Sequence, residues 1–286
     1  MDTRQTITEQ NRLSWNAATA AHNSHKVDQA AFFRAGGSKL FPEEIELLGD
    51  VRRARVVHLQ CNAGQDTLSI AQLGAHVTGV DISDEAIEFA RRLSVESGVP
   101  GEFHRADVYE WLDEAIRAGR QFDVVFYSYG ALCWLPDLKH WARGAAAVLR
   151  PGGRLVGIEF HPVISMFDER LALKFPYFGA EPIRWEDGVR DYVADSGAVL
   201  APSGYVEGVK DFRNPHACIE FNWSVADRLT AMIEAGLTID VVREYPYSNG
   251  CKFFEGSIVD ADRRWHLPPG MPAIPQMLAI VASRRA

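Results

Sequence analysis

Between residues 55 and 158, short apolar runs alternate with amphipathic segments, and this alternation narrows the possible folds more than any other feature. Helices are expected at 66–73, at 83–97 with Ser83 as N-cap, and at 140–149. The alternation is typical of a parallel sheet covered by helices, so the expected fold class is α/β with a doubly wound, mostly parallel sheet. The five expected strands are Arg55–Gln60, His76–Val80, Glu102–Arg105, Asp123–Tyr127 and Arg154–Glu159.

The two ends of the chain extend this pattern. Helical periodicity is present in Ile7–Ala21 and Glu43–Leu48. Near the C-terminus, a capped amphipathic helix at Ser224–Ala235 precedes two strands, Ile239–Glu244 and Met277–Ala282. We expect these two strands to form an antiparallel edge pair that completes a seven-stranded sheet.

The periodicity breaks between His161 and His216, where aromatic residues are interrupted by prolines and glycines. A long irregular segment inside a compact domain usually has a function, and disordered segments are poor in aromatics. We therefore expect an inserted cap of short strands and turns over a pocket. The expected organisation is an N-terminal helical lid (1–50), a cofactor-binding core (51–160), a substrate cap (161–216) and the C-terminal part of the core sheet (217–286).

Composition restricts the partners of the chain. The 286 residues carry a formal net charge of −8, whereas a nucleic-acid partner requires clustered Lys and Arg. The four cysteines are widely spaced and predict neither a metal site nor a disulfide framework. The apolar runs are too short for a bilayer, and the N-terminus has no signal-peptide core. These observations predict a cytoplasmic monomer or homodimer that acts on a small molecule.

Polar residues follow three successive strands, at the edge where doubly wound sheets bind ligands. The first strand runs into the loop Gln60–Gly64, and Asp81 ends the second, where a carboxylate can hold ribose hydroxyls. Asp107 follows the third strand. It suits either an adenine amine or the N-cap of the next helix, because Glu110 stands three residues further on.

The motifs QCNAG, GVDIS, RADV, FDVVFYSYGALCWL and LRPGGRLV, in this order, resemble those of class I S-adenosylmethionine-dependent methyltransferases of the small-molecule type. The resemblance covers about residues 40–160. It implies a Rossmann-like seven-stranded sheet that binds S-adenosyl-L-methionine and releases S-adenosyl-L-homocysteine. The loop from Gln60 would approach the methionine part, Asp81 the ribose, and Asp107 with Val108 and Ile82 the adenine. The cofactor-binding residues it implies are Gln60, Cys61, Asn62, Gly64, Asp81, Ile82, Asp107, Val108, Tyr127 and Ser128.

The first loop departs from the family pattern at three positions. Gln60 and Asn62 stand where glycines are usual, and His58 stands where an acidic residue is usual. We interpret His58 as a satisfied buried histidine. The absence of G-x-G-x-x-G also argues against a pyrophosphate cofactor such as NAD or FAD, because a pyrophosphate needs several glycines for close backbone approach.

Methyl transfer requires an acceptor held in line, with a base only where the acceptor must lose a proton. Candidate catalytic residues are His161 and His216, each of which could instead cap backbone, and Tyr129, which could instead pack. Glu159 could bind a cation or pair with an internal arginine. The candidate substrate-binding residues are His22, His25, Trp134 and Glu159.

The sequence thus predicts a methyltransferase of secondary metabolism that modifies N or O of a small aromatic or heterocyclic metabolite. One alternative keeps the cofactor but catalyses another reaction, such as a cyclisation. Another is a protein or RNA methyltransferase, and the acidic charge argues against RNA. A non-enzymatic scaffold would have no need of polar residues at three strand ends.

Overall fold

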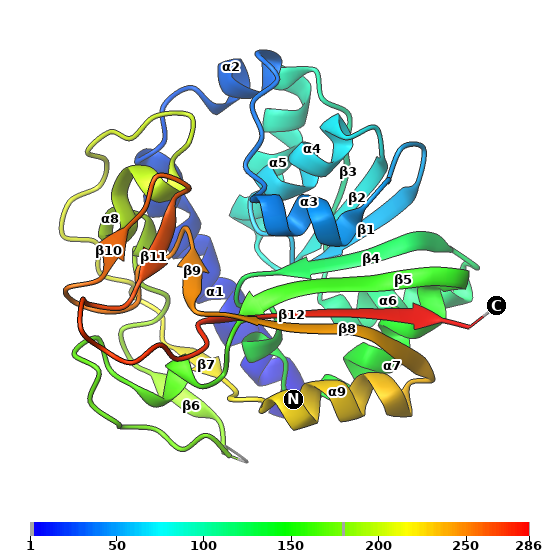
Figure 1. Cartoon of the computed structure of the whole chain (residues 1–286). Coiled ribbons are helices and arrows are strands. Elements are labelled where there is room, and N and C mark those ends of the chain that lie inside the picture. The colour runs from blue at the N-terminus through cyan, green and yellow to red at the C-terminus, as the bar shows by residue number, and fades with distance from the viewer. Residues whose placement is uncertain (1–2, 179–180, 286) are drawn as a thin grey trace.

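A computed structural model describes residues 3–178 and 181–285. Its centre is a seven-stranded sheet of order β3-β2-β1-β4-β5-β12-β8 (Figure 1). The first five strands are parallel and the chain order reverses between β1 and β4, so the α/β prediction is confirmed. The strands are β1 Arg55–Leu59, β2 His76–Asp81, β3 Glu102–Arg105, β4 Phe122–Ser128, β5 Leu149–Phe160, β8 Leu237–Tyr245 and β12 Met277–Arg284.

The last two strands form the expected antiparallel pair at one edge of the sheet. β12 joins the pair to the parallel strands by pairing antiparallel with β5, and β8 is the outermost strand. The burial patterns explain this order. Six consecutive residues of β12 from Met277 are buried, whereas in β8 only Leu237 is buried and the other residues are half-buried or exposed.

Helices cover both faces of the sheet (Figure 1). On one face, α3 and α4 pack against β-strand residues such as Val56 and Phe126, and α5 adds a neighbouring cluster around Phe103. On the other face, α6, α7 and α9 pack around the fully buried Trp141. These helices are α3 Pro42–Leu48, α4 Gln65–Gln72, α5 Asp84–Ser97, α6 Val108–Arg117, α7 Leu138–Val148 and α9 Val225–Glu234.

Local sequence signals set several of these boundaries. Ser83 caps α5 by accepting from the Ala86 N–H, and Gly98 ends the helix in the left-handed region with φ 72°. Residues 150–153 lie inside β5 as an irregularity, where Gly152 has φ 75° and the register with β4 shifts.

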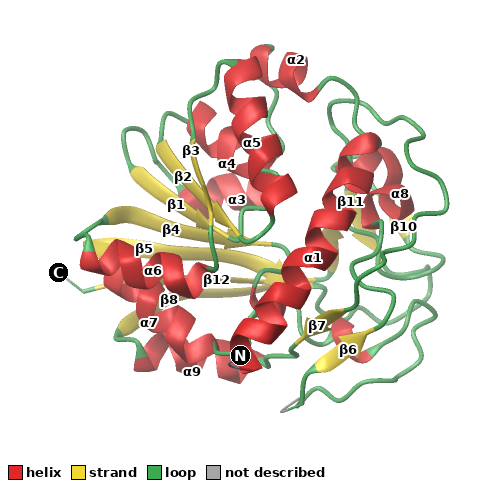
Figure 2. Cartoon of the chain, turned by 180° about the vertical axis from the view of Figure 1, so that it is seen from behind, coloured by secondary structure: helices red, strands yellow, loops and turns green. Residues whose placement is uncertain are grey.

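Most of the remaining elements lie on the side of the molecule that faces the carboxyl ends of the parallel strands (Figure 1). α1 Thr3–Ser24 is a long helix that crosses between the sheet and the small elements (Figure 2), and α2 Gln29–Arg34 packs on α5. The 161–216 region and its neighbours contribute a two-stranded sheet, β6 Ile183–Trp185 with β7 Cys218–Glu220, and the short helix α8 Tyr192–Ser196.

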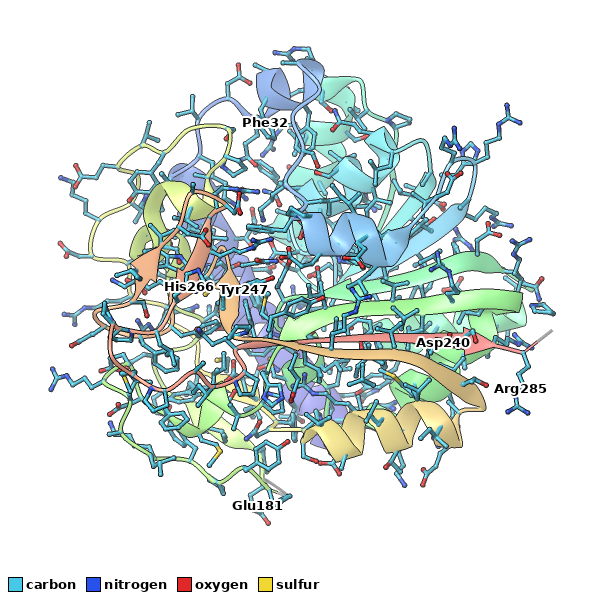
Figure 3. All side chains as sticks on the ribbon, in the orientation of Figure 1. Phe32, Glu181, Asp240, Tyr247, His266 and Arg285 are labelled. Carbon is cyan, nitrogen blue, oxygen red and sulfur yellow. The ribbon has the colours of Figure 1, made fainter. Side chains whose placement is uncertain are left out.

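A further three-stranded sheet was not predicted from the sequence. It consists of β9 Tyr247–Asn249, β10 Ile258–Val259 and β11 Arg264–His266, and Tyr247 and His266 lie side by side in it (Figure 3). These strands are only two or three residues long, too short for a period-two pattern. Within the described part of the chain, no helix has the length and apolar character needed to cross a membrane.

Candidate functional site

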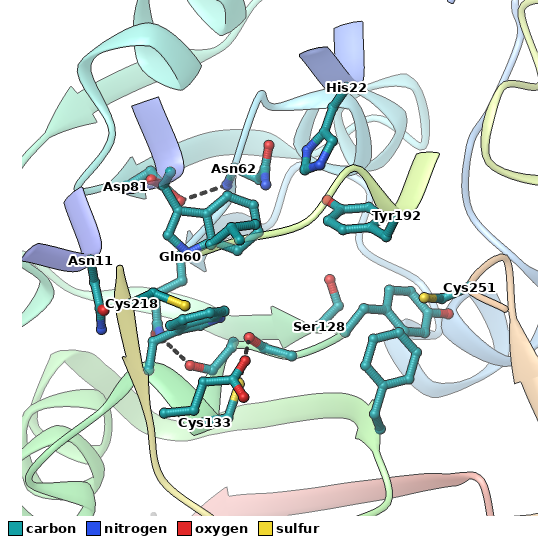
Figure 4. Close-up of a pocket in the computed structure, with 18 of the residues that line it drawn as sticks. Asn11, His22, Gln60, Asn62, Asp81, Ser128, Cys133, Tyr192, Cys218 and Cys251 are labelled. Atoms are coloured by element: carbon teal, nitrogen blue, oxygen red, sulfur yellow. Dashed lines mark hydrogen bonds between the residues drawn. The ribbon is translucent and has the colours of Figure 1, made fainter. Parts of the chain in front are cut away.

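A cavity of about 650 Å³ lies at the carboxyl ends of β1, β2 and β4, and α1 and the segment 185–200 form its opposite wall. This is the place where the order of the parallel strands reverses. Figure 4 shows polar side chains of the sheet edge facing Tyr192 across the cavity. The candidate residues that line it are His22, Gln60, Cys61, Asn62, Asp81, Ile82, Asp107, Val108, Ser128, Tyr129, Trp134 and Glu159.

The loop after β1 keeps a glycine-like backbone without the usual glycines. Gln60, Asn62 and Gly64 all have positive φ, at 55°, 49° and 77°. Such angles cost a non-glycine residue about 1–2 kcal/mol, and polar side chains can offset part of that cost by local hydrogen bonds. The loop therefore has the alternating left-handed shape that Gly-x-Gly-x-Gly would give, with Gln60 and Asn62 in place of the first two glycines.

The side chains of Gln60 and Asn62 bond to neighbouring protein groups. Gln60 Nε2 donates to the Ala131 carbonyl at 2.5 Å, and its Oε1 accepts from Trp141 Nε1 at 3.2 Å. Asn62 Oδ1 accepts from the Ala63 N–H at 2.6 Å. Each amide thus has a fixed position at the cavity wall, and Gln60 ties the first loop to the loop after β4.

Asp81 joins the end of β2 to the same loop. Its Oδ2 accepts from the Asn62 N–H at 2.7 Å and its Oδ1 from the Ser83 N–H at 2.9 Å. Burial raises the pKa of Asp81 to about 6, although the backbone donors oppose that rise. A carboxylate has about four lone-pair sites, so Asp81 retains acceptor capacity toward the cavity.

Asp107 is an N-cap and also a residue of the cavity wall. It caps α6 through Oδ1, which accepts from Tyr109 N–H at 2.8 Å and Glu110 N–H at 3.4 Å. It also lines the cavity, as do Ile82 and Val108. Since both cap bonds use one oxygen, the other remains suited to an exocyclic amine.

His58 is the satisfied buried histidine that the sequence suggested. Its Nδ1 lies 2.9 Å from Thr67 Oγ1, and its Nε2 lies 3.4 Å from Ser128 Oγ. Burial lowers the pKa of His58 to about 4, so the ring is neutral at pH 7. His58 therefore gives the first strand no charge at this position, in contrast to the acidic residue usual there.

Glu159 holds the loop after β4 in place. Its Oε1 accepts from the backbone N–H groups of Ala131 and Leu132 at 2.6 and 3.3 Å, and its Oε2 from that of Gly130 at 2.9 Å. Burial raises the pKa of Glu159, and the nearby charge of Arg228 opposes this. The carboxyl thus supports the loop that carries Tyr129, with Arg228 as the neighbouring cation.

Two of the implied cofactor residues do not line the cavity. Gly64 is buried beneath the loop, where a Cβ would lie 2.7 Å from Ala90 Cβ and 2.8 Å from the Phe103 ring. Tyr127 points to the other face of the sheet and packs against Trp141, with ring centroids 5.1 Å apart. The cause is strand alternation, because Ser128, the next residue, is the one that faces the cavity.

Three of the candidate histidines also lie outside the cavity lining. His161 Nε2 contacts Glu244 at 2.9 Å and its Nδ1 accepts from the Val163 N–H. His25 Nε2 contacts Asp191 at 2.8 Å and its Nδ1 accepts from the Gly208 N–H. The third, His216, does not line the cavity, and its backbone N–H donates to Asn214 Oδ1. These positions correct the roles expected for all three, since strand-end or loop position does not fix the direction of a side chain.

Aromatic rings form the wall opposite the sheet, and most were not singled out in the sequence. The Trp15 ring lies 5.4 Å from that of Trp134, and the His22 ring lies 4.1 Å from that of Tyr192. The aromatic content of 161–216 was the signal for this wall. Aromatic content alone could not identify Tyr192 as a lining residue. The segment has no helical or strand periodicity from which the direction of its side chains could be predicted. Further aromatic lining residues are Phe41, Phe160, Trp185 and Phe253.

Helix α1 closes the cavity by bonding to both sides. Asn11 pairs with the backbone of Ile219 in β7, donating to its O at 2.9 Å and accepting from its N–H at 2.7 Å. On the other side, Asn16 accepts from Ser83 Oγ at 2.8 Å and Arg12 pairs with Asp84. The helix is therefore anchored to the first turn of α5 and to the small sheets at once.

Residues 56–153 match a family profile described as a methyltransferase domain. With the sheet order and the site at the strand ends, this match identifies residues 56–153 as a methyltransferase domain and supports the class I S-adenosylmethionine-dependent type that the sequence motifs resemble. The fold indicated by the sequence motifs is confirmed, and the methyltransferase match lies within the residues that carry those motifs.

Similar proteins agree with this assignment. The ubiquinone biosynthesis O-methyltransferase of Bordetella avium (strain 197N) is 36% identical over 108 residues, covering 38% of this chain and 43% of the relative. That of Aromatoleum aromaticum (strain DSM 19018 / LMG 30748 / EbN1) is 33% identical over 141 residues, covering 49% of this chain and 56% of the relative. The chain thus spans about half the length of the curated relatives it matches.

Among solved structures, the DhpI-SAH complex has a TM-score of 0.55 at 16% identity and covers 99% of both chains. At this identity the likeness supports the fold, and it extends beyond the core to the whole length.

Proposed function

We propose that this chain transfers a methyl group from S-adenosylmethionine to an oxygen or nitrogen of a small aromatic or heterocyclic molecule. The observation that carries the proposal is one cavity with two different walls. The strand-end wall presents the left-handed loop, Asp81 and Asp107, and the opposite wall presents aromatic rings. A nucleoside suits the first wall and a flat acceptor the second.

The residues at the strand ends fit the cofactor. Asp81 would accept from the ribose hydroxyls, Asp107 from the adenine amine, and Ile82 with Val108 would flank the ring. The left-handed loop would lie along the methionine part. When bound, S-adenosylmethionine supplies an electrophilic methyl carbon with a good leaving group, so holding the acceptor in line supplies much of the rate acceleration.

A small acceptor is favoured over a macromolecule because the cavity is roofed. α1 is anchored on both sides, through Asn11 to Ile219 and through Asn16 to Ser83. The aromatic lining favours a flat molecule, and relatives named as O-methyltransferases support oxygen as the methylated atom. A protein or RNA substrate would need an open groove at this place.

Calorimetric titration with S-adenosylhomocysteine, followed by a transfer assay, tests the proposal. We expect saturable binding and release of S-adenosylhomocysteine from S-adenosylmethionine with phenols or nitrogen heterocycles. Absence of binding at millimolar concentration would overturn the proposal. Conversion of an acceptor without release of S-adenosylhomocysteine would instead identify a non-methylating enzyme of the same fold.

A further inference from the structure

His22 is a buried histidine with one ring nitrogen left free at the cavity. It stands near the end of α1, is 3% exposed, and points from the helix into the cavity above Tyr192 (Figure 4). Its Nε2 lies 2.9 Å from the carbonyl oxygen of Arg190. A carbonyl only accepts, so Nε2 carries the hydrogen and Nδ1 carries the lone pair. Among the residues that the structure describes, Nδ1 has no hydrogen-bond partner.

The other buried histidines have no such free nitrogen. His25, His58 and His161 each engage both ring nitrogens with protein groups. Buried polar atoms normally have hydrogen-bond partners. The unpaired nitrogen at the cavity wall therefore indicates that a bound molecule supplies its partner. The partner must be a hydrogen-bond donor, because the lone pair only accepts.

The surroundings of His22 keep its ring neutral. Burial lowers the pKa of His22 to about 4, and the hydrogen bond to the Arg190 carbonyl opposes this. The charged and titratable groups that act on it are His25 and Lys26, which directly follow α1, and Asp191 from the cap, with Tyr192 in ring contact. At pH 7 the Nδ1 lone pair is therefore available.

We propose that Nδ1 of His22 is the general base of the methyl transfer and that the acceptor is a hydroxyl group on a flat ring. This inference rests on the proposed function and specifies a hydroxyl group as the methyl acceptor. The hydroxyl proton passes to Nδ1 while the acceptor oxygen forms a bond to the methyl carbon. The carbon–sulfur bond breaks with its electron pair going to sulfur, and the imidazolium then returns its proton to water.

The fixed Nε2–H explains why this histidine suits the role. The Arg190 carbonyl sets the tautomer and continues to accept from Nε2–H when the ring becomes positive. The Asp191 charge also favours the protonated ring. The Tyr192 ring, 4.1 Å from that of His22, provides a flat surface beside the base.

The first test is the tautomer of His22, which requires no turnover. In ¹⁵N-histidine-labelled protein at pH 7, assigned with His22→Gln, we expect Nδ1 to give the signal of an unprotonated nitrogen. In the presence of S-adenosylhomocysteine, catechol should shift this signal and 1,2-dimethoxybenzene should not. An Nδ1 that carries the proton at pH 7 would overturn the proposal.

The second test is the rate with His22→Gln, in which the glutamine amide can still donate to the Arg190 carbonyl. We expect kcat for phenolic acceptors to fall about 10²–10⁴-fold, the usual contribution of a general base. S-adenosylhomocysteine affinity should be unchanged. The fall in kcat at low pH that the wild type shows should disappear in the variant. With a thiophenol acceptor, which ionises in solution and needs no base, kcat of the variant should fall little.

His216→Gln is the matched control, because His216 lies outside the cavity lining. It should retain the wild-type rate and pH profile. If His22→Gln methylates phenols at the wild-type rate, His22 is not the base. If the wild type binds no S-adenosylhomocysteine, the proposed function itself fails, and the two failures are distinguished by this binding measurement.

Discussion

The Asn62 N–H donates to Asp81 Oδ2 at 2.7 Å, so the residue that should hold the ribose also fixes the loop beside the methionine part. Asp81→Asn removes the charge. It also places an NH₂ group, which cannot accept a hydrogen bond, beside the backbone N–H of either Asn62 or Ser83. Loss of a charged hydrogen bond costs about 1.5–3 kcal/mol. We therefore expect S-adenosylhomocysteine affinity to fall at least about tenfold by calorimetry.

The control for this variant is Asp113→Asn, an exposed carboxylate on α6 that contacts His140. Circular dichroism should show both variants folded. Equal affinity for S-adenosylhomocysteine in wild type and Asp81→Asn would remove Asp81 from the cofactor site.

Cofactor affinity should depend on pH through the same carboxyl. Burial raises the pKa of Asp81 to about 6, so it gains a proton as the pH falls through 6. The protonated group accepts less well from ribose hydroxyls. We expect S-adenosylhomocysteine to bind more weakly at pH 5 than at pH 7.5, and Asp81→Asn to lose most of this difference. A flat wild-type profile would contradict the role.

At position 60, replacement by glycine should destabilise the protein less than replacement by alanine, which is the reverse of the usual order. Removing the Gln60 side chain leaves the buried Trp141 Nε1–H without its acceptor, at a cost of about 1–3 kcal/mol. Glycine recovers part of that cost, because Gln60 has φ 55° and glycine adopts it without strain. Chemical denaturation should therefore find Gln60→Ala less stable than Gln60→Gly. The opposite order would show that the left-handed backbone is not retained.

The sequence was sufficient to predict the core of this fold and the strand-end side of its site. The strand and helix periods of residues 55–158 locate the sheet, and Asp81 and Asp107 follow from their positions after successive strands. Sequence motifs cannot show which way a strand residue faces when both faces are buried. That is why Tyr127 was included with Ser128, although it packs against Trp141.

For the wall opposite the strand ends, the sequence predicted a cap over a pocket but only some of the residues that line it. Of the candidate residues expected there, His22 and Trp134 line the cavity, whereas His25 and His161 have protein partners for both ring nitrogens. Such partners come from segments far away in the chain, as Asp191 does for His25, and no local pattern reveals them. The same holds for Tyr192, which reaches the cavity from an irregular segment.

Asn11 should control how firmly α1 covers the cavity. Asn11→Ala removes both hydrogen bonds to the Ile219 backbone, which together contribute about 1–3 kcal/mol. We expect faster amide exchange in α1 and weaker S-adenosylhomocysteine binding, while exchange in β4 and β5 is unchanged. Glu88→Ala, on the exposed side of α5, is the control. Unchanged exchange in α1 would show that this pair does not anchor the helix.

A crystal structure with S-adenosylhomocysteine bound tests the central claim most directly. We expect the ribose hydroxyls at Asp81, the adenine between Ile82 and Val108, and the sulfur directed toward the part of the cavity that contains His22 and Tyr192. S-adenosylhomocysteine bound elsewhere, or a sulfur directed away from these two rings, would contradict the account.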